Sequence, residues 1–106
     1  MNKKSKHLMD FISGAIDHPD VSGFEALEIL DVRSRLASRE PILDEPDRAR
    51  LEGLDRQLLQ MADSLMECIS EVASLAEMRR RAHVLPSHWW WYLDGITSDK
   101  RKVAAG

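Results

Sequence analysis

The amino-acid sequence predicts an all-α protein: a helical bundle built on one long heptad-patterned helix, with two shorter N-terminal helices and a short Trp-rich C-terminal helix or segment. Apolar residues recur at helical spacing over most of the chain. Leu, Glu, Arg, Ala and Met, which favour helices, dominate the composition. The five glycines and four prolines are too few for a β-rich chain. We expect residues 1–96 to form a single helical domain and residues 97–106 a flexible basic tail.

Start and stop signals delimit the two N-terminal helices. The first is expected over about residues 4–16, where apolar side chains share one face, and Pro19 prevents its continuation. The second is expected over about residues 22–38. Ser22 and Glu25 have the spacing of a capping box, in which each residue satisfies a backbone N–H of the other's turn.

The central helix is expected to run without a break over residues 47–84, after an N-cap at Asp44. Apolar residues follow strict 3-4 spacing along it. This seam consists of Leu51, Leu54, Leu58, Met61, Leu65, Cys68, Val72 and Leu75. A second apolar line runs beside the seam, and the two together form a face wider than a two-stranded coiled coil uses.

The length of the central helix favours a homodimer. An unbroken helix over these residues would be about 57 Å long, which is far longer than a compact domain of this size is wide. The two N-terminal helices cannot easily cover both apolar lines along such a rod, so we expect a second copy of the chain to cover the rest. The alternative is a bundle that folds back on itself and hides the seam within one chain.

A run of aromatic residues follows Pro86, in a short last helix expected over about residues 88–96. The run is Trp89, Trp90, Trp91 and Tyr92. Successive helical positions are about 100° apart, so three adjacent indoles cannot share one face. Trp and Tyr are enriched at binding hot spots, and we expect this segment to dock onto a partner protein. The alternative is that it folds back and closes the end of the bundle.

Three arginines precede the aromatic run: Arg79, Arg80 and Arg81. They are candidates for the same partner-binding surface. Cations near the C-terminal end of a helix also complement its dipole, which is the plainer explanation for them. Together with the aromatic run they would suit stacking on single-stranded nucleic acid.

Two pairs of carboxylates form an ExxE…ExxD arrangement. The residues are Glu25, Glu28, Glu52 and Asp55. The arrangement resembles the paired motif of the all-α nucleoside triphosphate pyrophosphatases, over about 30 residues. The resemblance implies that these four carboxylates, on two facing helices, hold Mg²⁺, which binds and polarises a triphosphate. The alternative is that they lie on solvated helix faces.

Charge, cysteine content and the lack of long apolar runs limit the partners and the compartment that the sequence predicts. The net charge of −3 is too small to indicate a nucleic-acid partner, and the single cysteine, Cys68, cannot form an intrachain disulfide. No apolar run approaches the roughly 20 residues of a membrane span, and the N-terminus is a poor secretory signal, so we expect a cytoplasmic protein without membrane contact.

These observations favour a non-catalytic helical protein–protein interaction module, such as an inhibitor, an antitoxin or an adaptor. It would need no cofactor, dimerise through its long helix and dock a partner protein through its Trp-rich segment. The alternatives are a Mg²⁺-dependent pyrophosphatase and a regulator associated with single-stranded nucleic acid.

Overall fold

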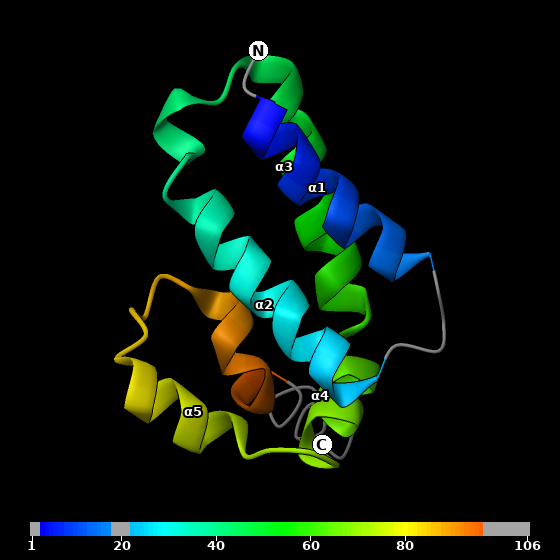
Figure 1. Cartoon of the computed structure of the whole chain (residues 1–106), viewed down its shortest axis with the longest axis vertical. Coiled ribbons are helices and arrows are strands. Elements are labelled where there is room, and N and C mark those ends of the chain that lie inside the picture. Colours follow the sequence, from blue (N-terminus) through cyan, green and yellow to red (C-terminus); the bar gives the residue numbers. More distant parts are fainter. Residues whose placement is uncertain (1–2, 18–21, 97–106) are drawn as a thin grey trace, which may run out of the picture.

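Three helices side by side form the body of the protein (Figure 1). In the computed structural model, which describes residues 3–17 and 22–96, all regular structure is helical. Helix α1 (Lys3–Ile16) runs antiparallel to α2 (Gly23–Ala37), and α3 (Glu45–Gln60) runs antiparallel to α2 in turn. A short 3₁₀ turn, η1 (Glu40–Ile42), connects α2 to α3.

Local capping explains where α2 and α3 begin. The side chain of Ser22 accepts a hydrogen bond from the backbone N–H of Glu25 (3.1 Å), which is one half of the capping box that the spacing predicts; within the described residues, the Glu25 side chain does not return a hydrogen bond to Ser22. Asp44 accepts from the N–H of Asp47 (3.0 Å) in the same way at the start of α3. Both N-terminal helices therefore begin and end within about a residue of their expected bounds.

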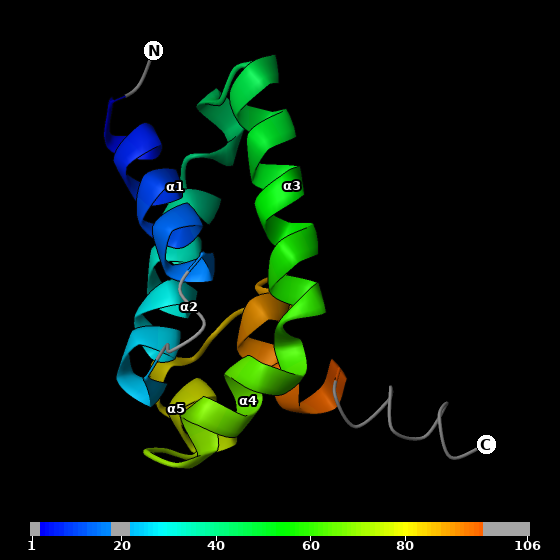
Figure 2. The ribbon, with the colours of Figure 1, turned by 90° about the vertical axis from the view of Figure 1, so that its right-hand side faces the viewer.

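The unbroken helix expected over residues 47–84 is not confirmed. The structure divides this stretch into α3, α4 (Ala62–Ser70) and α5 (Leu75–Ala82). Met61 leaves the helical backbone conformation (φ −92°, ψ 3°) between α3 and α4. Ser74 then caps α5 by accepting from the N–H of Glu77 (3.3 Å). The chain changes direction at both breaks, so α4 and α5 lie at the lower end of the bundle (Figure 2).

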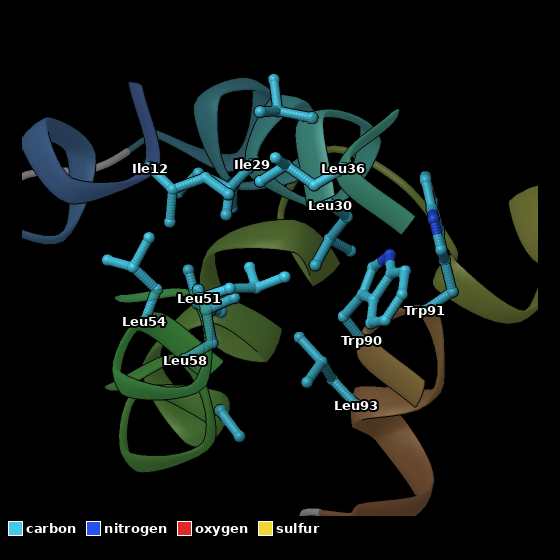
Figure 3. Close-up of a cluster of buried hydrophobic side chains, with 14 of the residues drawn as sticks. Ile12, Ile29, Leu30, Leu36, Leu51, Leu54, Leu58, Trp90, Trp91 and Leu93 are labelled. Atoms are coloured by element: carbon cyan, nitrogen blue, oxygen red, sulfur yellow. The ribbon is translucent and has the colours of Figure 1, made fainter. Parts of the chain in front are cut away.

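Most of the seam packs into the core of its own chain (Figure 3). Its fully buried members are Leu51, Leu54, Leu58, Leu65 and Leu75. Met61 and Cys68 are half-buried, and Val72 is exposed. The buried members of the seam meet Met9 and Ile12 of α1 and the apolar side of α2. The folded-back bundle, one of the two alternatives that the sequence left open, is therefore how this chain buries its seam.

The C-terminal part of the described chain returns to the bundle. The 3₁₀ helix η2 (Trp89–Tyr92) packs against both α2 and α5. The basic tail expected over residues 97–106 lies outside the described residues. No helix within residues 3–17 and 22–96 combines the length and the apolar character that crossing a bilayer requires.

Candidate functional site

The aromatic run packs against α2 and α5. Trp90 and Trp91 are only 2% and 8% exposed, while Trp89 and Tyr92 are half-buried. Figure 3 shows Trp90 in the same apolar cluster as Leu30 of α2. The segment thus folds back onto its own chain, with two rings buried and two half-buried.

Ser34 of α2 holds both buried indoles. Its hydroxyl oxygen accepts hydrogen bonds from the indole N–H groups of Trp90 (2.9 Å) and Trp91 (2.8 Å). A hydroxyl has two lone pairs and one hydrogen. Because the indoles use both lone pairs, the hydrogen is left for Nδ1 of His88, 3.2 Å away. One serine therefore has its full hydrogen-bonding capacity engaged by three rings of the C-terminal segment.

Arg33, next to Ser34, is buried among acidic and aromatic partners. It donates from Nε and Nη2 to the two carboxylate oxygens of Asp55 (2.7 and 3.0 Å) and from Nη2 to Glu40 (2.9 Å). Its guanidinium carbon lies 4.1 Å from the ring centroid of Trp90. Burial alone would lower the pKa of Arg33, but the hydrogen bonds and charges of Asp55 and Glu40 raise it above the ordinary value. Arg33 is therefore a fixed charge that joins α2, α3 and η2.

The three arginines of α5 have different roles. Arg79 donates to the carboxylate of Asp94 (2.6 and 3.2 Å) and to the backbone oxygen of Trp91 (2.8 Å). It thereby fastens the segment after η2. Arg80 and Arg81 both pair with Glu77 on their own helix and are largely exposed. Arg79, which is partly buried, therefore holds the C-terminal segment in place, whereas Arg80 and Arg81 form ion pairs at the surface.

The four carboxylates of the ExxE…ExxD arrangement do not meet. Glu25 and Glu28 line a cavity beside α1, whereas Glu52 and Asp55 line a different one near Arg48. Asp55 is already bound to Arg33. Among residues 3–17 and 22–96, no three His, Cys, Asp or Glu side chains are grouped as a metal site requires. The Mg²⁺ site implied by the resemblance is therefore not assembled, because the two motifs face different neighbours.

A surface of different character lies between α1 and α2. It contains a cavity of about 390 Å³. We call it the α1–α2 face, and its lining residues are Asp10, Phe11, Gly14, Ala15, Glu25 and Glu28. A Cβ atom built on Gly14 meets no atom within 4 Å, so the surface is open at this point. Phe11 is 37% exposed, and Phe24, one turn before Glu28 on α2, is 71% exposed.

The α1–α2 face carries an excess of negative charge. Residues 8–17 and 22–31 contain five acidic side chains and no Lys or Arg: Asp10, Asp17, Glu25, Glu28 and Asp31. Asp10 pairs with Arg50 of α3 (2.7 Å), whose hydrogen bond lowers the pKa of Asp10, and Asp31 pairs with Arg35 (2.9 Å). The side chains of Glu25 and Glu28 have no such partner among the described residues. Unpaired carboxylates thus border an apolar depression.

No protein-family model matches the chain, and neither the curated proteins nor the solved structures include a match. The apolar spacing of the sequence includes Phe11 and Phe24 in the apolar faces of their helices, and nothing in the sequence pattern indicates a role for Gly14. The side chains of neighbouring helical positions point about 100° apart, so Phe11 and Ile12 face different directions, which is the sign that the sequence offers.

Proposed function

We propose that this chain is a non-catalytic interaction module, and that it binds another protein through the α1–α2 face. The observation that carries the proposal is the combination of the exposed Phe11 ring with the unpaired carboxylates of Glu25 and Glu28 around one open depression. Burying the ring would release ordered water, and a partner could supply the charges that this chain does not.

The polar side chains near the aromatic run already bind one another, which supports a binding role for the chain rather than a catalytic one. Arg33 and Ser34 are occupied by internal partners, so neither is free to act on a substrate. Asp55 is neutralised by Arg33 in the same way. A partner that docked on Trp90 or Trp91 would first have to break their hydrogen bonds to Ser34. The α1–α2 face can be covered without any such loss.

Electrostatics disfavour nucleic acid as the partner of this face. Phosphate groups would meet Glu25 and Glu28, and binding to nucleic acid depends on releasing counterions through basic side chains. The candidate basic residue nearest to the aromatic run, Arg79, is bound to Asp94. A protein surface is the better complement.

The test is photo-crosslinking in the native cell extract from a probe at the exposed position of Phe24. Gly14→Trp would fill the depression, and Gly53→Trp is the matched control, because Gly53 also lies within a helix and has no atom within 4 Å of a built Cβ. We expect one protein to be crosslinked by the parent chain and by Gly53→Trp, and lost with Gly14→Trp. Equal crosslinking by both variants would exclude this face.

The same experiment addresses self-association. If the crosslinked protein is a second copy of the chain, light scattering of the purified protein will give twice the monomer mass, and Gly14→Trp will return it to the monomer. The homodimer expected from the sequence would then form through α1 and α2, since the seam is largely occupied within the chain.

A further inference from the structure

The side of the α1–α2 pair that carries the depression can accommodate a helix. Helix α3 lies on one side of the pair, and Figure 2 shows no described element on the opposite side. The helices have 14 and 15 residues, which gives each a length of about 21 Å. Side-chain ridges on two neighbouring helices leave a groove that a third helix can enter at a preferred angle. A partner helix of about four turns would match this length.

The depression over Gly14 gives such a helix a place for one large apolar side chain. Phe11 lies one turn before Gly14 on α1, and Ala15 follows it on the side of α2. The absence of a side chain at Gly14 leaves the backbone of α1 accessible between them. A leucine or an aromatic ring that entered here would contact Phe11 and Ala15 together, as anchors do when an amphipathic helix lies in a groove.

The negative charges around the depression favour a partner whose polar side is basic. Glu25 and Glu28 border it from α2, and their nearest basic neighbours along the chain are already paired or lie at the far end of α1. Lysine or arginine side chains of a partner would neutralise them, whereas an acidic partner would add repulsion. Partly buried pairs of this kind affect specificity and association rate more than affinity.

We infer that the α1–α2 face receives a basic amphipathic helix, which places one bulky apolar side chain over Gly14 and Lys or Arg side chains against Glu25 and Glu28. This inference rests on the proposed function and names the chemistry of its partner. It completes a bundle in which α1 and α2 are covered by α3 and α4 on one side and by the partner on the other.

The probe is a synthetic helical peptide of about four turns, with leucines along one side and lysines along the other. Its control has the same leucines with glutamates in place of the lysines. Fluorescence polarisation of labelled peptide against the full chain gives the dissociation constant. We expect the lysine peptide to bind and the glutamate peptide not to bind.

Matched variants locate the binding. Gly14→Trp is expected to lower the affinity for the lysine peptide on the order of tenfold, because it blocks the site of a central anchor. Gly53→Trp is expected to leave the affinity unchanged. The double variant Glu25→Gln, Glu28→Gln preserves shape and is expected to weaken binding about three- to tenfold at low salt. The control double variant Glu67→Gln, Glu71→Gln removes the same charge from two exposed positions, one in α4 and one directly after it, and should have no effect.

The experiments distinguish a failure of the inferred partner chemistry from a failure of the proposed function. A lysine peptide that binds all variants equally, or binds no better than the glutamate peptide, would overturn the inference. If the native crosslink nevertheless depended on Gly14, the proposed function would stand with a partner of different chemistry. If neither the peptide nor the crosslink depended on Gly14, both would be wrong. Circular dichroism of each variant confirms that the helices are retained.

Discussion

The guanidinium of Arg33 lies over the ring of Trp90 in the interior, with its carbon 4.1 Å from the ring centroid and both residues at most 3% exposed. Asp55 binds the outer edge of the guanidinium at 2.7 Å. Arg33 therefore connects three parts of the chain that are distant in sequence. Only its Nη1 has no hydrogen-bond partner among the described residues.

Removing Arg33 should destabilise the fold strongly. Arg33→Ala leaves the partly buried Asp55 without its partner and Trp90 without its stacked cation, and we expect the free energy of unfolding to fall by about 3 kcal/mol. Urea titration followed by tryptophan fluorescence measures this. Arg35→Ala is the control on the same helix, because its pair with Asp31 is solvent-exposed and should contribute less than about 1 kcal/mol. Similar losses in the two variants would contradict the role given to Arg33.

Ser34→Ala tests the hydrogen bonds that hold the aromatic run. The substitution leaves two buried indole N–H groups without an acceptor, which should lower the free energy of unfolding by at least about 2 kcal/mol. Tryptophan emission should also move to longer wavelength as water reaches Trp91. Ser64→Ala, at an exposed position within α4, makes the same chemical change without burial and should be close to neutral. A spectrum unchanged by Ser34→Ala would show that the indoles do not depend on this hydroxyl.

The sequence predicts the helical class and the first two helices well, because capping and proline act locally. It does not predict the division of the central helix, because the residues on either side of each break still face the core. Leu58, Leu65 and Leu75 keep their spacing although the chain turns between them. One local signal was present: Ser74 and Glu77 have the same capping spacing as Ser22 and Glu25, and they mark the start of α5.

The candidate site was harder to predict than the fold. Phe11 and Phe24 fit the apolar pattern of their helices, and only the packing of α1 against α2 shows that both rings remain exposed. For the aromatic run the difference is the reverse: the sequence favours exposed rings that bind a partner, whereas Trp90 and Trp91 are buried. A 3₁₀ turn and one serine on a distant helix bury Trp90 and Trp91, and nothing near either residue in the sequence indicates that serine. The first outcome depends on the packing of two consecutive helices, and the second on contacts between residues 56 positions apart in the chain.

Acid should loosen the C-terminal segment through Asp94. The hydrogen bond from Arg79 holds the pKa of Asp94 below its usual range. A carboxyl whose pKa is lower in the folded state contributes stability above the unfolded value of about 3.9 and loses it as the pH falls through the folded value. Asp94→Asn should therefore reduce the free energy of unfolding at neutral pH, and the difference from the parent should shrink below about pH 4. Urea titrations across this range measure it, and a difference that stayed constant with pH would exclude this ion pair as its cause.

Gly23 should tolerate no side chain, because α4 approaches the start of α2 there. A Cβ atom at this position would collide with the backbone oxygen of Cys68 and lie 2.6 Å from a methyl carbon of Val72. Relieving the first contact requires the backbone of α4 to move, so Gly23→Ala should lower the free energy of unfolding by about 1–3 kcal/mol. Gly53→Ala, in the open interior of α3, should instead raise it by roughly 0.5–1 kcal/mol, since alanine favours the helix. Thermal and urea unfolding of the pair would reveal opposite signs. Equal and small effects would mean that α2 and α4 are farther apart than this packing requires, and that the turn after α3 does not bring them together.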